Sequence, residues 1–246
     1  MRPSLPGQLV VSAAAQQASA ATAPLFTRRP GPSMQELEKQ GGLNSTGLQD
    51  DGFIMPLFTA RELLTLQYYV RGAERYLEWG SGTSTFIVGP MAKRSWSVDN
   101  HKPWCEMMQK DKVALKFWQA EGVLHYTCVD TGPTEQFGMP GPGVPLDQKK
   151  RYPDVVDTFG QPHYDAVLVD GRYRVACALK ALPYLTDASV VLVHDWEERR
   201  ELYGKPLLQF YETAEQVDRL MVLRRRTAWD AVAAKTMLQE YYDVPA

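Results

Sequence analysis

From about residue 52 onward, short apolar runs alternate with longer amphipathic segments, and this alternation limits the fold more than any other feature. It predicts buried strands separated by helices, after a first helix that is capped by Thr59 and ended by Gly72. Strands that alternate with helices need crossover connections, so we expect a doubly wound, mainly parallel α/β sheet with helices on both faces. The expected strands are Arg75–Trp79, Arg94–Val98, Val123–Val129, Tyr164–Val169, Ser189–Val193 and Arg219–Arg225. The expected helices are Thr83–Met91, Pro103–Ala120, Val175–Leu185 and Pro206–Glu215.

The charge balance excludes one broad class of function. The chain carries 27 Lys and Arg against 29 Asp and Glu, whereas proteins dedicated to nucleic acids show a clear basic excess. Its 44% apolar and 23% charged residues are globular values, and no run of about 18 apolar residues predicts a membrane span. We therefore expect a globular protein without a nucleic-acid partner or a membrane span.

The first 50 residues differ in composition from the remainder. No acidic residue occurs from Met1 to Met34, and Val11–Pro24 is mostly Ala, Ser, Thr and Gln. Such a segment has too little bulky apolar surface to offset the entropy of ordering it, so we expect a flexible or disordered arm at 1–50 and one domain at 51–246. An organelle transit peptide and the stem of a secretory-pathway protein share this composition. The sequon Asn44-Ser45-Thr46 favours the stem but is as common in ordinary loops, so the compartment stays open.

The connection at 131–163 breaks the rhythm of strands and helices. It contains Gly132-Pro133, Met139-Pro140-Gly141-Pro142-Gly143 and Tyr152-Pro153, so it cannot be one continuous helix. Long loops inside compact domains cover substrates, bind ligands or decorate the surface. A substrate-covering role and a decorated surface loop are equal alternatives here.

The three cysteines, Cys105, Cys128 and Cys177, are odd in number and widely spaced. This spacing offers neither a disulfide framework nor a CxxC metal clip. We therefore expect all three to be small, buried apolar residues.

The first predicted strand leads into a glycine turn, Glu78-Trp79-Gly80-Ser81-Gly82. The two glycines allow a sharp turn and a close approach to a ligand. The turn lacks the third glycine of the dinucleotide fingerprint and the Gly-Lys-Ser/Thr of a P-loop. The carboxylate of Glu78 would repel a pyrophosphate and attract a cationic ligand. The turn is therefore poorly suited to NAD or ATP, and a nucleotide-dependent oxidoreductase is disfavoured.

The pattern Glu78-x-Gly80-x-Gly82-x-Ser84 resembles motif I of the class I S-adenosylmethionine (SAM) dependent methyltransferases. Asp99, 21 positions after Glu78, ends the second predicted strand, where this family binds the ribose hydroxyls. The resemblance covers about residues 55–225 and implies a Rossmann-like fold. Asp130, after the third strand, is similar to the position that meets the adenine, with capping of the next loop as its alternative. The SAM-binding residues that the resemblance implies are Glu78, Gly80, Ser81, Gly82, Ser84, Asp99, Asn100 and Asp130.

The fourth and fifth predicted strands end in Asp170-Gly171-Arg172 and His194-Asp195. This pair resembles the branch of the family that methylates oxygen, and it implies Asp170, His194 and Asp195 as catalytic residues. His194 as a general base, oriented by Asp170 or Asp195, is slightly favoured. In the alternative, Asp170 and Asp195 hold a divalent cation, with His194 as a third ligand, which acidifies the hydroxyl. The sequence departs from the Asp-Asn pattern of small cation-dependent members, which weakens the case for a metal.

Arg172 is the candidate substrate residue. Together with Arg174 it could pair with an acidic acceptor such as a uronate, although Arg174 has an ion pair with Glu197 or Glu198 as its alternative. We therefore expect a SAM-dependent O-methyltransferase that acts on a hydroxylated small-molecule or carbohydrate acceptor. A catalytically silent binding or scaffold protein of the same fold is the rival hypothesis. The oligomeric state is not indicated.

Overall fold

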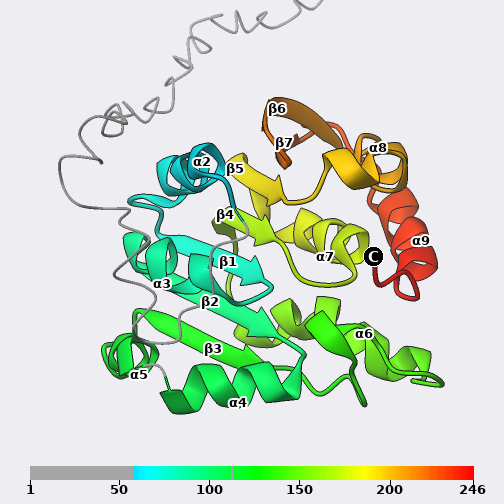
Figure 1. The fold of residues 1–246 in the computed structure, drawn as a ribbon. Coiled ribbons are helices and arrows are strands. Elements are labelled where there is room, and N and C mark those ends of the chain that lie inside the picture. The colour runs from blue at the N-terminus through cyan, green and yellow to red at the C-terminus, as the bar shows by residue number, and fades with distance from the viewer. Residues whose placement is uncertain (1–57, 112) are drawn as a thin grey trace, which may run out of the picture. The chain divides into compact units, whose positions relative to one another are not determined.

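A seven-stranded sheet forms the centre of the computed structural model, which describes residues 58–111 and 113–246 (Figure 1). The strand order is β3-β2-β1-β4-β5-β7-β6. Strands β1 to β5 pair in parallel, and β7 runs antiparallel to β5 and β6. The order reverses between β1 and β4, and ligands of open α/β sheets bind at such a reversal, beyond the carboxyl ends of the strands. The strands are β1 (Arg75–Trp79), β2 (Arg94–Asp99), β3 (Leu124–Cys128), β4 (Tyr164–Val169), β5 (Leu185–Val193), β6 (Tyr211–Val217) and β7 (Leu220–Arg225).

The six predicted strands and the α/β class are confirmed, and the seventh strand was missed. The prediction of a helix at Pro206–Glu215 is wrong, because β6 begins at Tyr211. β6 is the edge strand of the sheet, and its residues are exposed from Glu212 to Gln216. An exposed, charged edge strand carries no alternation of apolar and polar residues that would reveal it.

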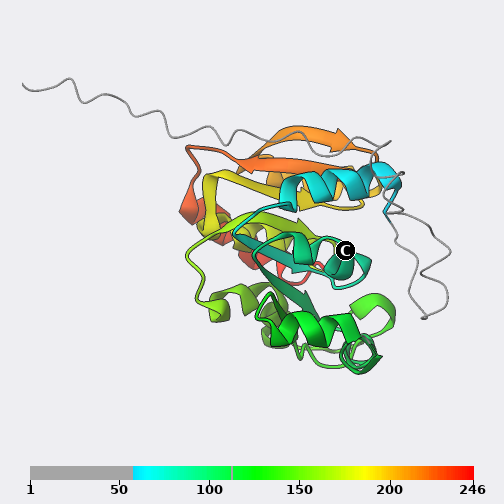
Figure 2. The ribbon, with the colours of Figure 1, turned by 90° about the vertical axis from the view of Figure 1, so that its left-hand side faces the viewer.

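Helices lie on both faces of the sheet, as predicted. Figure 2 shows α2 in front of the strands and α9 behind them. Thr59 caps α2 as expected, because its side chain accepts from the Glu62 amide while the Glu62 carboxylate accepts from the Thr59 amide. The helices are α2 (Ala60–Val70), α3 (Thr83–Ile87), α4 (Lys102–Asp111), α5 (Val113–Ala120), α6 (Leu146–Asp154), α7 (Arg174–Ala181), α8 (Arg200–Leu207) and α9 (Ala231–Tyr241).

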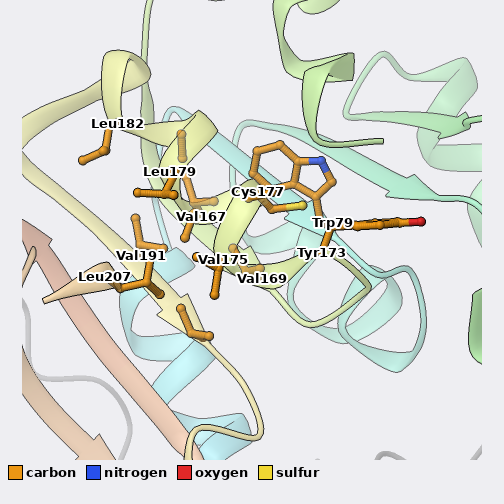
Figure 3. Close-up of a cluster of buried hydrophobic side chains, with 14 of the residues drawn as sticks. Trp79, Val167, Val169, Tyr173, Val175, Cys177, Leu179, Leu182, Val191 and Leu207 are labelled. Carbon is orange, nitrogen blue, oxygen red and sulfur yellow. The ribbon is translucent and has the colours of Figure 1, made fainter. Parts of the chain in front are cut away.

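Alternate residues of β1, β4 and β5 supply two cores, and a third, smaller cluster packs α4 and α5 on β3. Toward α2, the cluster contains Tyr76, Leu168 and Leu192 from β1, β4 and β5. Toward α7, α8 and α9, the neighbouring positions Leu77, Val167 and Val191 join the larger cluster. Figure 3 shows how the side chains of α7 pack on β4 and β5 in this second core. Burial on both faces explains why these strands read as continuous apolar runs.

The prediction for the cysteines is corrected in part. Cys105 and Cys128 form a disulfide with Cα atoms 5.9 Å apart, whereas Cys177 is free and buried as expected. The pair lies 23 residues apart in sequence. Cys128 stands opposite Asp99 in the β2–β3 register, and α4 begins shortly after Asp99. The first turn of α4 therefore brings Cys105 back to the end of β3.

Several predictions fall on residues that the structure does not describe. These are the arm at 1–50 with its sequon and the first part of the domain at 51–246. Within the described residues, no helix is both long and apolar enough to cross a membrane.

Candidate functional site

The predicted glycine turn lies between the carboxyl ends of β1 and β4. Gly80 has a φ of +101°, and a Cβ atom there would lie 2.4 Å from the Gly171 amide nitrogen. Position 80 therefore requires glycine, because the turn after β1 passes close to the backbone at the end of β4. Gly82 differs, because a Cβ atom on it would meet no atom within 4 Å. The turn thus has a closely packed side at Gly80 and an open side at Gly82.

Glu78 lies behind this turn and is fully buried. Its carboxylate accepts from the hydroxyls of Tyr76 at 2.9 Å and Ser97 at 2.6 Å, and from that of Thr85. Ser84, which is also buried, adds a side-chain hydrogen bond. Burial raises the pKa of Glu78, and these hydroxyls offset part of that rise. Glu78 is therefore placed to hold the turn through hydroxyl groups, without an open path to a ligand.

Asp99 ends β2 beside the same turn. Its carboxylate accepts from the amide of Ser81 at 3.0 Å and from the Ser81 hydroxyl at 2.8 Å. The amides of Asn100 and His101 donate to its other oxygen at 2.8 and 3.0 Å. Burial raises the pKa of Asp99, and the hydrogen bonds from these donors offset part of that rise. The nitrogen of the Trp104 ring in turn donates to the Ser81 carbonyl at 3.0 Å. Asp99 and the Gly80–Gly82 turn are thus one connected unit.

The loop after β3 covers this edge of the sheet. The side-chain amide of Asn100 donates to the Gly138 carbonyl at 2.9 Å and to the Thr131 hydroxyl at 3.1 Å. His101 contacts the Thr134 hydroxyl at 3.0 Å. These contacts place residues 131–138 beside Asn100, one of the predicted SAM residues, and the substrate-covering role stays a prediction. Asp130 instead accepts from the Gly132 amide at 2.9 Å, the capping arrangement given above as its alternative.

The structure brings the three predicted catalytic residues together. Nδ1 of His194 lies 2.8 Å from Oδ1 of Asp170 and 3.5 Å from Oδ1 of Asp195. The His194 side chain is only 2% exposed, whereas those of Asp170 and Asp195 are 21% and 23% exposed. An acceptor can therefore reach the two carboxylates more readily than the imidazole. The Asp170 amide also donates to the Trp79 carbonyl at 2.8 Å, which fixes it next to the glycine turn.

The buried guanidinium of Arg174 forms ion pairs with the carboxylates of both Asp170 and Asp195. It is 4% exposed, and its guanidinium pairs with Asp195 at 2.9 Å and with Asp170 at 3.5 Å. It also donates to the His194 carbonyl at 2.6 Å and to the Gly171 carbonyl at 2.9 Å. Its ion pairs are therefore with Asp170 and Asp195, rather than with the Glu197 or Glu198 suggested by the sequence.

Glu62 is a member of this site that the sequence did not reveal. Its carboxylate is fully buried at the start of α2, and Oε2 lies 3.5 Å from Nε2 of His194. Oε1 accepts from the Arg219 amide at 2.7 Å. The capping pattern Thr59-x-x-Glu62 is visible in the sequence, but it indicates only a helix start. The contact between α2 and the end of β5 depends on tertiary packing.

The imidazole of His194 thus lies between carboxylates on both sides. Burial lowers its pKa, but Asp170, Asp195 and Glu62 raise it by more, so the net pKa is above the usual 6.5. For Asp195, burial raises the pKa, and Arg174 and His194 outweigh this effect, so the net pKa is below 3.8. The site therefore favours an ionised Asp195 beside a protonated or readily protonated imidazole.

The same cluster is the candidate cation site. Asp170, His194 and Asp195 each offer one ligand atom, and these atoms lie within 4.8 Å of one another. Carboxylate oxygens with one imidazole nitrogen suit a divalent metal ion, so these three side chains have the ligand types that such an ion binds. Arg174 already supplies positive charge to both carboxylates.

Arg172 follows β4 and is partly buried at the rim of the site. Its Nε donates to the Phe137 carbonyl at 2.7 Å. Phe137 has a φ of 57° and a side chain that is 73% exposed. Arg172 therefore joins the end of β4 to the loop at 131–138, and its role toward a substrate stays a prediction.

Solved structures resemble this chain, although no protein-family model matches it and no curated protein is significantly similar to it. A methyltransferase-like protein from Silicibacter pomeroyi is 27% identical over 78% of this chain and 99% of its own, with a TM-score of 0.64. A tRNA (m1A58) methyltransferase from Aquifex aeolicus is 12% identical over 72% and 74%, with a TM-score of 0.47. A predicted O-methyltransferase from Agrobacterium tumefaciens is 9% identical over 63% and 74%, with a TM-score of 0.41.

The match to the Silicibacter protein spans nearly all of that protein and agrees with the motif that follows β1. The seven-stranded sheet, reversed between β1 and β4 and ended by an antiparallel strand pair, fits the fold implied by the resemblance. By sheet order and structural likeness, this chain has the Rossmann-like fold of the class I SAM-dependent methyltransferases, and it is similar to a methyltransferase-like protein.

Proposed function

We propose that the chain transfers the methyl group of SAM to a hydroxyl oxygen of a small-molecule or carbohydrate acceptor. One observation carries this proposal, the Asp170–His194 pair beside the glycine turn. The pair couples a partly exposed carboxylate to an imidazole at 2.8 Å, next to the turn on which the family binds its cofactor. Transfer to a hydroxyl oxygen, unlike transfer to a neutral amine, needs help with the removal of a proton, because a neutral hydroxyl is a weak nucleophile.

The residues around the turn fit SAM in charge and in space. SAM carries a sulfonium cation, and Asp99 and Asp170 both lie at the carboxyl edge next to Gly80–Gly82. The open side at Gly82 leaves room for a ligand against the backbone. Asp99 would hold the ribose hydroxyls, in exchange for part of its bonding to the Ser81 hydroxyl. Asn100 and the loop at 131–138 would close over the adenine side.

In the proposed mechanism, Asp170 contacts the acceptor and His194 supports it from behind. The imidazole of His194 is neutral before the step; the acceptor O–H bond then breaks, and its proton moves to the Asp170–His194 pair. The new O–CH₃ bond forms as the S–CH₃ bond of SAM breaks, leaving the neutral thioether. Positioning of the two reactants supplies much of the acceleration, since well-oriented reactions reach effective molarities of about 10⁵ M or more. His194 is then a positioning and proton-holding residue, because its burial keeps the acceptor from direct contact.

A divalent cation held by Asp170, His194 and Asp195 is the second candidate for proton removal. Such an ion would acidify the acceptor hydroxyl. We favour the pair without a metal, since the guanidinium of Arg174 already pairs with both carboxylates and supplies one positive charge between them. Turnover should then persist within about twofold after dialysis against EDTA. Loss of turnover that Mg²⁺ or Mn²⁺ restores would assign the role to a cation.

Binding of S-adenosylhomocysteine, the demethylated product, tests the first half of the proposal. Calorimetry should show binding to the wild type, and Asp99→Ala should weaken it at least about tenfold, since a charge-assisted bond contributes about 1.5–3 kcal/mol. Asp187→Ala, at an exposed aspartate far from the turn, is the matched control. Absence of binding at about 1 mM ligand contradicts the proposal.

Methyl transfer to a panel of phenols, catechols and sugars tests the second half. Asp170→Ala should lower turnover at least about a hundredfold while product binding is kept, because general base catalysis contributes about 10²–10⁴. Binding without transfer to any acceptor would favour the silent scaffold protein. Competition by NAD and not by SAM would favour the oxidoreductase.

A further inference from the structure

The side chain of Arg172 is bonded to the loop after β3. Among the described residues, its guanidinium makes one hydrogen bond, in which Nε donates to the Phe137 carbonyl at 2.7 Å. Before Arg172, the Gly171 carbonyl accepts a hydrogen bond from Arg174 at 2.9 Å. After Arg172, the backbone turns at Tyr173, which adopts a φ of 53°. A guanidinium that bonds through Nε retains its two NH₂ groups for a ligand.

Arg172 also lacks a matching negative charge within the described residues. The charged neighbours that act on it are Arg174 and Arg199, which lower its pKa after burial, the larger cause. The nearby carboxylates are engaged elsewhere, since Asp195 pairs with Arg174, Arg199 and Arg219. Partly buried cations are usually paired, because the loss of hydration is otherwise uncompensated. A negatively charged ligand would supply the partner that Arg172 lacks among the described residues.

We propose that Arg172 forms a carboxylate-binding subsite, so that the acceptor is a hydroxylated carboxylic acid. This inference rests on the proposed function, since it places the acceptor hydroxyl at Asp170. The two residues are separated by one glycine, which suits a small acceptor with its hydroxyl and its carboxylate a few bonds apart. The planar fork of Arg172 matches both oxygens of a carboxylate, while Asp170 and Asp195 disfavour an acid that approaches in the reverse orientation.

The carboxylate of the methionine moiety of SAM has the same chemistry and is the other source of such a charge. We assign the subsite to the acceptor because only Gly171 separates Arg172 from Asp170, where the proposed function places the acceptor hydroxyl. The two sources predict different losses when Arg172 is changed. An acceptor site affects binding of the acid alone, whereas a cofactor site affects binding of S-adenosylhomocysteine.

The test compares acids with neutral partners of the same shape. The full chain is saturated with S-adenosylhomocysteine and titrated by calorimetry with protocatechuate and its primary amide, and with methyl glucuronide and methyl glucoside. Wild type, Arg172→Gln and Arg172→Lys are compared with Arg200→Gln, an exposed arginine at the start of α8. Thermal melting establishes that each variant is folded.

In the wild type, at least one acid should bind about tenfold or more tightly than its neutral partner. Arg172→Gln should abolish this preference, Arg172→Lys should retain part of it, and Arg200→Gln should keep it. The Kd for S-adenosylhomocysteine should stay within about twofold in all variants.

Equal binding of acids and neutral partners, or no binding of either, overturns the subsite. A tenfold loss of S-adenosylhomocysteine binding in Arg172→Gln assigns the charge to the cofactor and overturns it as well. Failure of the wild type to bind S-adenosylhomocysteine contradicts the proposed function itself.

Discussion

Nδ1 of His194 lies 2.8 Å from Oδ1 of Asp170, while Nε2 of the same ring lies 3.5 Å from Oε2 of Glu62. The ring therefore joins the end of β4 to the start of α2. Phe58 lies against it, with ring centroids 4.3 Å apart. A protonated imidazole interacts favourably with both carboxylates, whereas a neutral one turns a lone pair toward one of them. The protonation of His194 should therefore contribute to the stability of the fold.

The first prediction concerns the pH dependence of stability. The folded-state pKa of His194 is raised above 6.5, because the carboxylates outweigh burial. A raised pKa means that the folded state binds the proton more tightly than the unfolded state. The contribution is thus complete below about pH 6.5 and is lost as the pH rises through the folded-state value. The difference in free energy of unfolding between wild type and His194→Gln should shrink from about pH 6 to pH 9.

Urea unfolding at a series of pH values measures this difference. His125→Gln serves as the control, because His125 is exposed on β3 and stacks on Trp96. A difference that grows with pH would mean that His194 is buried in its neutral form, contrary to the environment described here. A difference that stays flat would mean that the carboxylates do not act on its protonation.

The second prediction contrasts the two glycines of the turn. Gly80→Ala should lower the free energy of unfolding by about 2–4 kcal/mol, since its Cβ atom would overlap the backbone of Gly171 at a positive φ. Gly82→Ala should cost less than about 1 kcal/mol, because its backbone is extended and its surroundings are open. If SAM uses that open side, Gly82→Ala should still weaken product binding by at least about tenfold. Similar stability for both variants would contradict the crossing of the β1 turn over β4.

Much of this architecture could be predicted, because its signals are local. β1, β2 and β4 are buried on both faces, and each contains large apolar residues, so these runs are visible without any knowledge of their neighbours. The acids at the strand ends follow directly from these runs. β6 could not be predicted in this way, since its residues from Glu212 to Gln216 are exposed and polar.

The remaining part of the site depends on contacts between distant segments. Glu62 reaches His194 across 132 positions, and no local pattern marks such a pair. Cys105 and Cys128 became neighbours only through the pairing of β2 with β3. For Arg174 the sequence left an acidic acceptor and an ion pair with Glu197 or Glu198 as alternatives, because it does not show that this side chain lies against Asp170 and Asp195. Asp230, which accepts from Val232 and Ala233 at the start of α9, was a helix signal that could have been used.

The third prediction concerns the disulfide. Its loop of 23 residues should contribute about 3 kcal/mol to the free energy of unfolding in the chain-entropy model. A reducing agent should therefore lower the melting temperature of the wild type, and the double variant Cys105→Ala/Cys128→Ala should melt at the reduced value with or without the agent. Cys177→Ala should retain the response, because Cys177 is not part of the bond. A wild type that melts at the same temperature in both conditions would show that the bond contributes nothing measurable.

The fourth prediction concerns the buried guanidinium of Arg174. Arg174→Met replaces the cation with an apolar side chain and removes the positive charge that pairs with Asp170 and Asp195. It should cost about 3–5 kcal/mol at pH 7. The pKa of Asp195 is lowered from 3.8 because Arg174 and His194 outweigh burial. A lowered pKa contributes stability above the unfolded-state value, and this contribution is lost as the pH falls through the folded-state value. The cost of Arg174→Met should therefore decrease below about pH 4, where the carboxylates no longer need a partner.

Urea unfolding at pH 7 and at lower pH measures this cost, with Arg200→Met as the exposed control. A cost that is equal at both pH values would mean that Arg174 stabilises the fold through its hydrogen bonds to the carbonyls of Gly171 and His194, and not through its charge.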